Sequence, residues 1–169
     1  MGVLGSAAAK ALRALQFNVI GWSRNQKQVP EVTSYYGQDQ LQAFLRQTEF
    51  LVILLPLTDQ THGIVNQDFL GSLPRGAFII NAGRGPLIVD RDLLAALDRG
   101  HIAGAALDVF NQEPLPAESP YWKHPAVTIT PHVASITLPV TSARHVADNI
   151  QRHRAGKPLT HLADLSRGY

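Results

Sequence analysis

The sequence has no cysteine, which excludes disulfide scaffolds, thiolate metal sites and cysteine nucleophiles together. It also lacks an apolar run near the roughly 20 residues of a membrane-spanning helix. Residues 1–10 have neither the basic stretch nor the long apolar core of a secretion signal. The sequence has no large excess of one charge either, because 15 Lys and Arg nearly balance 13 Asp and Glu and give a net charge of +2. We therefore expect a cytoplasmic protein that binds neither nucleic acid nor a membrane.

What the sequence does have is an alternation of short apolar runs with helical patterns. The apolar runs predict strands over 17–22, 50–55, 77–81, 102–109 and 127–130. Helical spacing predicts helices over 6–16, 38–47, 66–73, 91–99 and 141–155. Asp90 is the expected N-cap of the fourth helix and Gly100 its end, and Gly156 ends the last helix. Such apolar runs are typical of parallel strands buried on both faces, so the fold class is α/β, a doubly wound parallel sheet of the Rossmann type.

The first five residues resemble a GxGxxG fingerprint that has lost its first glycine, with Met1 as the first x. In such a loop the backbone approaches a pyrophosphate at the next glycine, and N–H groups at the helix start hold the phosphates. A glycine-containing helix start without any ligand is the alternative. The candidate cofactor contacts here are Gly2, Val3, Leu4 and Gly5.

The residues that close the strand at 17–22 indicate which dinucleotide is preferred. About 20 positions past the glycine loop, NAD-binding domains carry an acidic residue that binds the adenosine ribose. Ser23 stands there instead, followed by Arg24 and Lys27. A small hydroxyl and two cations remove repulsion and offer charge-assisted hydrogen bonds to a 2′-phosphate, which favours NADP over NAD, although NAD stays possible. Solvated loop charges are the alternative interpretation.

Three motifs further along carry a specific resemblance: Asn-Ala-Gly-Arg-Gly at 81–85, Asp-Val-Phe-Asn-Gln-Glu-Pro at 108–114, and Thr-Pro-His at 130–132. Together they resemble the signatures of the D-isomer-specific 2-hydroxyacid dehydrogenases. Within that family the sequence is most similar to bacterial glyoxylate/hydroxypyruvate reductases, as in Leu-Leu-Pro-Leu-Thr at 54–58 and Pro-His-Val-Ala at 131–134. The resemblance implies reduction of a small 2-keto acid by hydride transfer from NADPH.

The resemblance also implies three catalytic residues. Arg84 matches the arginine that binds the substrate carboxylate and polarises the keto group, which suits a planar guanidinium. His132 matches the proton donor, since imidazole changes charge near neutral pH. Glu113 matches its partner, and a carboxylate bonded to the ring favours the protonated form. Replacing Glu113 should therefore move the pH optimum.

Further cofactor contacts follow from the same resemblance. Leu55 and Pro56 are expected to line the adenine side, Ala82 and Gly83 to pass the nicotinamide ribose, and Asp108 to lie near the carboxamide. Capping of the turn after its strand is the alternative for Asp108. Thr61 is expected to reach a phosphate, and Ala134 is the last candidate contact.

The resemblance implies a domain organisation as well. Residues 1–139 are expected to form a truncated dinucleotide-binding domain, and residues 140–169 a helix and tail that pack on a separate substrate-binding domain. The first sheet strand and most of that second domain are expected before Met1 in a longer protein, a homodimer, so that the 169 residues alone should be inactive. A non-catalytic dinucleotide-sensing module, or a family member with another 2-hydroxy acid substrate, are the alternatives.

No metal site is expected. The remaining histidines show no ligand spacing with Asp or Glu. They are His62, His101, His124, His145, His153 and His161.

Overall fold

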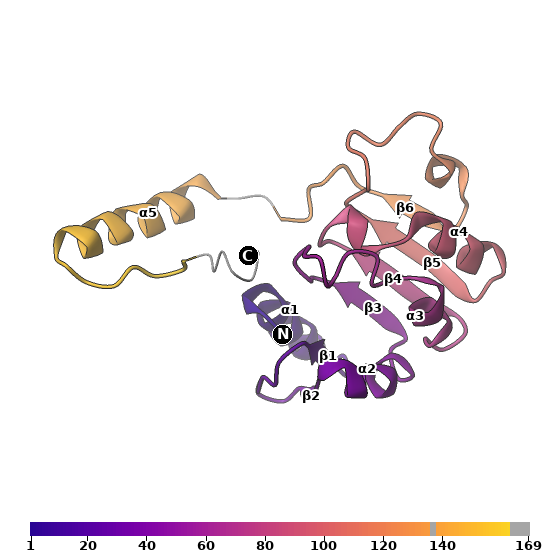
Figure 1. Ribbon diagram of the computed structural model, residues 1–169, viewed down its shortest axis with the longest axis horizontal. Coiled ribbons are helices and arrows are strands. Elements are labelled where there is room, and N and C mark those ends of the chain that lie inside the picture. Colours follow the sequence, from indigo (N-terminus) through magenta and orange to yellow (C-terminus); the bar gives the residue numbers. More distant parts are fainter. Residues whose placement is uncertain (136–137, 163–169) are drawn as a thin grey trace.

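The computed structural model describes residues 1–135 and 138–162, and within them the strands form two separate parallel sheets (Figure 1). β1 (Ile20–Ser23) pairs with β2 (Thr33–Tyr36). The larger sheet has the strand order β3-β4-β5-β6. Its strands are β3 (Phe50–Ile53), β4 (Ala77–Asn81), β5 (Ile102–Leu107) and β6 (Val127–Ile129). The five predicted strands are thus confirmed, with shorter bounds for all but β4.

The helices follow the predicted alternation. They are α1 (Val3–Ala14), α2 (Gly37–Leu45), α3 (Gln67–Gly71), α4 (Asp90–Asp98) and α5 (Pro139–Arg154), with 3₁₀ turns η1 (Gly85–Leu87) and η2 (Pro120–Lys123). Gly100 and Gly156 end their helices with φ of +61° and +64°, as predicted, because a left-handed residue suits glycine. The N-cap prediction is wrong: Val89 occupies that position, and the Asp90 carboxylate instead accepts a hydrogen bond from the Tyr121 hydroxyl at 3.0 Å.

The strand β2 was not predicted. Its Thr-Ser-Tyr-Tyr sequence is only half-buried or exposed, so it lacks the apolar run on which the strand predictions rest. β1 also begins later than predicted, since Phe17 is exposed and Gln16 turns the chain with φ +66°.

The topology is that of a Rossmann-type sheet divided in two. In the order 3-2-1-4-5-6, β1 and β2 of this chain take places 2 and 3, and β3, β4 and β5 take places 4, 5 and 6. The two sheets separate where that order has its first strand. In the described residues β1 pairs only with β2, and β3 only with β4.

The core lies on one face of the larger sheet. Leu51 and Ile79 of the sheet join Leu70 of α3 with Leu93 and Leu97 of α4 in one buried cluster. The other face carries Phe50 and Phe78, whose rings stack with centroids 5.1 Å apart and are 58% and 40% exposed. The expectation of strands buried on both faces is therefore wrong for β3 and β4, because α3 and α4 cover only one side.

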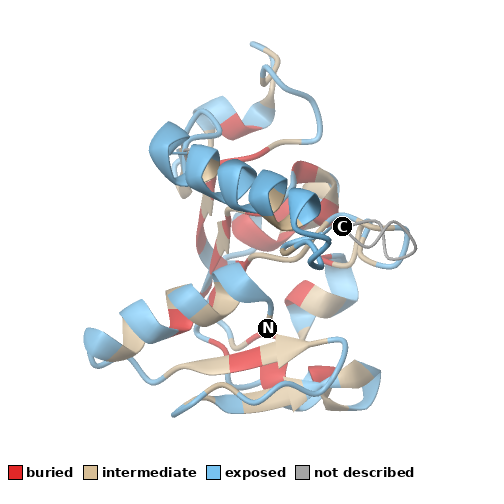
Figure 2. Cartoon of the chain, turned by 90° about the vertical axis from the view of Figure 1, so that its left-hand side faces the viewer, coloured by how far each residue is buried: buried red, intermediate tan, exposed pale blue. Residues whose placement is uncertain are grey.

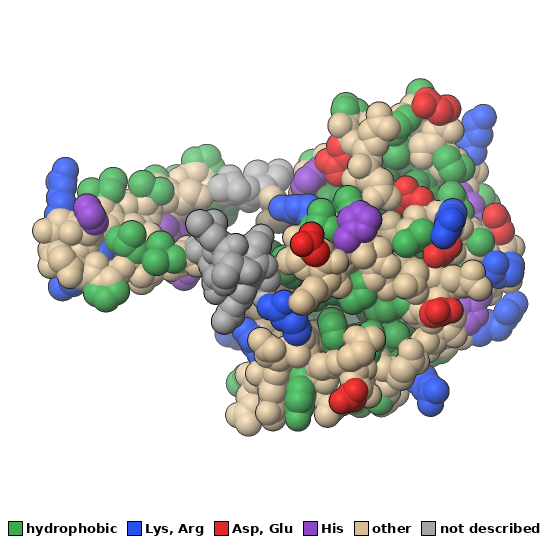
Figure 3. Space-filling view, viewed as in Figure 1, with side chains coloured by type: hydrophobic (Ala, Val, Ile, Leu, Met, Phe, Trp, Pro, Cys, Tyr) green, Lys and Arg blue, Asp and Glu red, His purple; other side chains and the backbone are tan. Residues whose placement is uncertain are grey.

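The helix α5 stands apart from both sheets (Figure 1), and none of its residues is buried (Figure 2). Hydrophobic side chains run along it in the space-filling view (Figure 3). Val146 and Ile150, four positions apart and therefore on the same face of α5, are both exposed. No helix in the described part of the chain is long and apolar enough to cross a membrane.

Candidate active site

A histidine–glutamate pair lies beyond the carboxyl ends of β5 and β6. The His132 Nδ1 atom lies 2.7 Å from Glu113 Oε2. The other carboxylate oxygen of Glu113 accepts a hydrogen bond from the Phe110 backbone N–H at 2.9 Å. The backbone of His132 has a left-handed φ of +55°, and the backbone N–H of this residue donates to the Asp108 carbonyl at 2.9 Å. The ring is half exposed, so its Nε2 remains available to a ligand.

The Asp108 side chain organises the segment that carries His132. This buried carboxylate, at the end of β5, accepts hydrogen bonds from the Thr130 hydroxyl at 2.5 Å and from the N–H groups of Val133 and Ala134 at 2.9 Å each. Donors on both sides of His132 in the sequence thus converge on one carboxylate. This arrangement holds the histidine backbone in a conformation that is uncommon for a residue with a side chain.

The loop that carries Arg84 is shaped by Asn81, the last residue of β4. The Asn81 side chain is buried, donates to the Arg84 carbonyl at 3.1 Å and accepts from the Gly83 N–H at 3.1 Å. A Cβ atom at Gly83 would lie 3.1 Å from the Leu55 carbonyl oxygen, so glycine permits this close approach to the end of β3. Arg84 itself is exposed, and its guanidinium donates to the Gly83 carbonyl at 2.7 Å.

Hydrogen bonds, with a smaller contribution from nearby charges, lower the pKa of both carboxylates at this edge. The hydrogen bond from His132 is the main cause that lowers the pKa of Glu113, and the Phe110 N–H and the charges of His132 and Arg84 add to it. Burial would raise the pKa of Asp108, but the donors from Thr130, Ala134 and Val133, together with the charge of His132, lower it overall. Both groups are therefore held as anions.

The free energy of unfolding should fall in acid because of these two carboxylates. Each has a lowered pKa in the folded state, so its contribution is complete above the ordinary values of 3.8 for Asp108 and 4.5 for Glu113. That contribution is lost as the pH falls through the lower folded values. Urea unfolding between pH 6 and pH 2, compared with the variant Asp108→Asn, should give a shallower pH slope for the variant. Glu118→Gln, on the same loop as Glu113, is the matched control, and an equal slope in all three proteins contradicts this assignment.

The predicted phosphate-binding residues lie at the start of α1. Gly2 is the N-cap residue, and Val3, Leu4 and Gly5 form the first helical turn. That turn contains no acidic residue, so none of its own side chains neutralises the partial positive charge of the helix start. Met1 packs over β1, because its side chain fills the space beside Gly21.

The predicted 2′-phosphate residues follow β1. Ser23 closes the strand, and its hydroxyl donates to the Asn25 carbonyl at 2.9 Å. Arg24 and Lys27 are exposed on the connection to β2. The Arg24 guanidinium donates from Nη1 to Gln60 Oε1 at 2.9 Å, which joins this connection to the loop after β3.

The loop after β3 contains Leu55, Pro56 and Thr61. The Thr61 hydroxyl donates to the Pro56 carbonyl at 2.7 Å and accepts from the Thr58 N–H at 2.8 Å. These bonds make Thr61 a fixed part of the loop, and its contact with a phosphate stays a prediction. Contact of Asp108 with a carboxamide stays a prediction too. Within the described residues, the hydrogen bonds of its carboxylate do not go to the turn after its strand but to Thr130, Val133 and Ala134.

The structure thus brings Arg84, Glu113, His132, Asp108 and Ala134 to one edge of the larger sheet. Ala82 and Gly83 lie between β4 and Arg84 on the same edge, while the residues of α1 and of the β1–β2 connection belong to the other half of the chain. Sequence reasoning missed the site roles of three residues. Asn81 and Thr130 stood within quoted motifs, but only the structure shows their bonds, and nothing in the sequence pairs Gln60 with Arg24.

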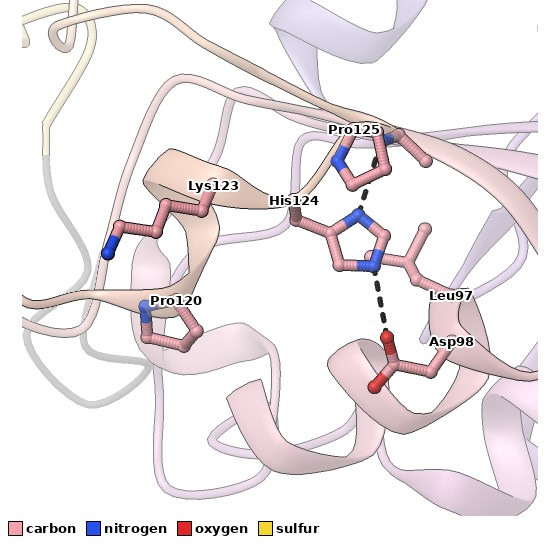
Figure 4. A pocket seen from close by; sticks show the side chains of 7 residues that line it. Leu97, Asp98, Pro120, Lys123, His124 and Pro125 are labelled. Atoms are coloured by element: carbon pink, nitrogen blue, oxygen red, sulfur yellow. Dashed lines mark hydrogen bonds and ion pairs between the residues drawn. The ribbon is translucent and has the colours of Figure 1, made fainter.

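A different histidine–carboxylate pair lines a hollow at the opposite edge (Figure 4). His124 precedes β6 and points its Nε2 at Asp98 Oδ1, 3.4 Å away, at the end of α4. The hollow has a volume of about 560 Å³ and opens between α4 and η2. Its place at the amino end of β6 separates it from His132, which follows the carboxyl end. Across residues 1–135 and 138–162, no group of three or more His, Asp or Glu is placed to hold a metal ion.

Comparison with known proteins identifies the family. Residues 1–134 match the D-isomer specific 2-hydroxyacid dehydrogenase, NAD binding domain. The chain belongs to this family. It is 48% identical over 168 residues to glyoxylate/hydroxypyruvate reductase A of Salmonella choleraesuis, and the match covers 99% of the chain and 54% of the relative.

Solved structures of the same 2-hydroxyacid dehydrogenase family agree. A D-isomer specific 2-hydroxyacid dehydrogenase of Xanthobacter autotrophicus, in complex with NADPH and MES, matches with a TM-score of 0.96 and 47% identity, covering 99% of this chain and 69% of that one. An NADPH-dependent glyoxylate/hydroxypyruvate reductase of Sinorhizobium meliloti, with NADP and sulfate, matches with a TM-score of 0.95 and 45% identity, covering 100% and 55%. The chain thus spans about half the length of the curated relatives it matches.

Proposed function

We propose that this chain is the NADPH-binding part of a reductase that converts small 2-keto acids, such as glyoxylate and hydroxypyruvate, to 2-hydroxy acids. The observation that carries the proposal is the 2.7 Å pair of His132 and Glu113, placed on the edge that also holds Arg84. The relatives named as glyoxylate/hydroxypyruvate reductases support the substrate class, and the bound NADPH and NADP of two neighbours support the cofactor.

The residues present fit an NADP molecule. The first turn of α1 offers N–H groups and contains no acidic residue, and Arg24 and Lys27 supply positive charge after β1, which ends in Ser23 rather than in an acidic residue. When bound, the cofactor supplies the hydride that adds to C2 of the keto acid. The remaining chemistry, which is binding the carboxylate and delivering a proton, falls to the side chains of this chain.

Two side chains divide that work. The exposed guanidinium of Arg84 offers a planar set of donors, which suits a carboxylate and the adjacent keto oxygen. His132 gives the proton to that oxygen from Nε2, since Nδ1 is engaged by Glu113. The lowered pKa of Glu113 keeps this partner anionic, so the Nδ1 proton stays bonded to a carboxylate while Nε2 faces the substrate.

We further propose that α5 packs on a substrate-binding domain; residues 163–169 of the predicted tail lie outside the described residues. In support, α5 buries none of its residues, and it exposes Val140, Val146 and Ile150, as does Leu138, the N-cap residue before it. The family match also ends at residue 134, before this helix.

The test is NADPH oxidation at 340 nm with glyoxylate and hydroxypyruvate. We expect no turnover from the 169-residue chain, because the substrate-binding domain on which α5 is proposed to pack is supplied only in a chimera. We expect turnover from a chimera in which the part of the Salmonella choleraesuis reductase that the chain does not match is joined before Met1. The chimera should show a higher kcat/KM with NADPH than with NADH. A chimera that folds and binds NADPH but reduces neither acid contradicts the proposal.

A further inference from the structure

A hydrogen bond between Arg24 and Gln60 links the segments that follow the two sheets near the proposed adenosine site. Arg24 lies directly after β1, and Gln60 lies in the loop after β3. The guanidinium Nη1 donates to the Gln60 side-chain carbonyl at 2.9 Å, across 36 positions of sequence. Both side chains are exposed, so no burial forces them together. The bond therefore reflects how the two connections are placed relative to each other.

The loop that presents Gln60 is held firmly on both sides. The Thr61 N–H and His62 N–H donate to the Thr58 carbonyl at 3.0 and 2.9 Å, which closes a tight turn around Gln60. The Thr61 hydroxyl ties this turn to Pro56, and the Gly63 N–H donates to the Pro86 carbonyl in η1 at 2.8 Å. Gln60 thus extends from a turn that is fixed to the larger sheet.

From this geometry we infer that Gln60 is a positioning residue for cofactor specificity: it holds the guanidinium of Arg24 where a 2′-phosphate on the adenosine ribose can bind it. The inference rests on the proposed function, because it assumes that the chain binds NADP. Arginine loses less freedom per hydrogen bond when its planar fork is fixed beforehand, so one bond at Nη1 orients the other donors.

The chemistry of the glutamine amide suits this task. Its carbonyl oxygen accepts a hydrogen bond from the guanidinium without adding a negative charge beside the phosphate. A carboxylate at position 60 would hold Arg24 more strongly. It would also place a negative charge beside the phosphate and repel it. The variant Gln60→Glu therefore distinguishes the holding of Arg24 from the binding of the phosphate.

The experiment is calorimetric titration of the full 169-residue chain with adenosine 2′,5′-bisphosphate and with adenosine 5′-monophosphate. Arg24→Ala should weaken the bisphosphate by about 10- to 100-fold, as expected for one charged hydrogen bond. Gln60→Ala should weaken it by about 3- to 10-fold, the size of one neutral hydrogen bond. Gln60→Glu should weaken it by about 10-fold or more. The monophosphate, which lacks the 2′-phosphate, should bind all variants equally.

The double variant Arg24→Ala/Gln60→Ala decides whether Gln60 acts through Arg24. If it does, the double variant binds the bisphosphate as Arg24→Ala does, within about 2-fold, because the two effects do not add. Multiplied effects would mean that Gln60 contacts the phosphate by itself, which overturns the inference. Gln67→Ala, an exposed glutamine on α3, is the matched control and should change nothing.

Failure of this inference is distinguishable from failure of the proposed function. If the wild type binds the bisphosphate and Arg24→Ala weakens it, while Gln60→Ala and Gln60→Glu do not, the positioning role is overturned and NADP binding stands. If the wild type binds neither nucleotide, the proposed cofactor site itself is refuted, and the role of Gln60 with it.

Discussion

Replacing His132 by asparagine in the chimeric reductase is expected to lower kcat by about 10²- to 10⁴-fold, the usual contribution of a positioned general acid. Asparagine retains a polar side chain but has no proton to transfer near neutral pH. The KM for the keto acid should change much less, because Arg84 rather than His132 is proposed to bind the carboxylate. Steady-state rates with hydroxypyruvate at saturating NADPH measure both constants.

The chain offers a matched control for this substitution. His124 also pairs with a carboxylate, that of Asp98 at 3.4 Å, but lies at the opposite edge of the sheet (Figure 4). His124→Asn should therefore leave kcat within about 2-fold of the parent, as expected for a change outside the site. Equal losses from the two substitutions would mean that His132 matters for folding rather than for proton transfer.

The fold followed closely from apolar runs and glycines. The strands β3 to β6 were predicted because apolar residues predominate in each, and their helix partners begin and end near polar or glycine residues. The strand β2 was not predicted, because a half-exposed strand does not require a run of apolar residues. The exposure of Phe50 and Phe78 was not predicted either, because composition does not reveal which face of a sheet is covered by helices.

The site was predicted in its parts but not in its connections. The motifs named Arg84, Glu113 and His132, and the structure places the last two in contact. Asp108 was assigned to the cofactor, yet its carboxylate receives donors from residues 22 to 26 positions further along the chain. Such long-range bonds depend on how β5 and β6 align, which no local pattern encodes.

Replacing Gly85, between the Arg84 loop and the Glu113 loop, is expected to have a large effect on the free energy of unfolding. Gly85 follows Arg84 and begins η1, and it packs directly on the backbone of the loop that leads to Glu113. A Cβ atom there would overlap the carbonyl group of Phe110 and lie 2.5 Å from the Asn111 nitrogen. Both neighbours are backbone atoms, so no side chain can rotate away. The contact therefore fixes the separation between the Arg84 loop and the Glu113 loop.

Gly85→Ala should consequently lower the free energy of unfolding by about 3 kcal/mol or more, at the upper end for overpacking, since the strain falls on main chain. Urea unfolding of the 169-residue chain measures this change. Gly71→Ala is the control: a Cβ there meets nothing within 4 Å, and alanine in place of glycine in α3 should stabilise the chain by up to about 1 kcal/mol.

Because the backbone N–H of Phe110 donates to Glu113, the strain should also reach the His132 ring, and the imidazole resonances of His132 should shift in Gly85→Ala but not in Gly71→Ala. Unchanged stability in Gly85→Ala would mean that the two loops can separate freely, and that their close approach does not hold Arg84 beside Glu113.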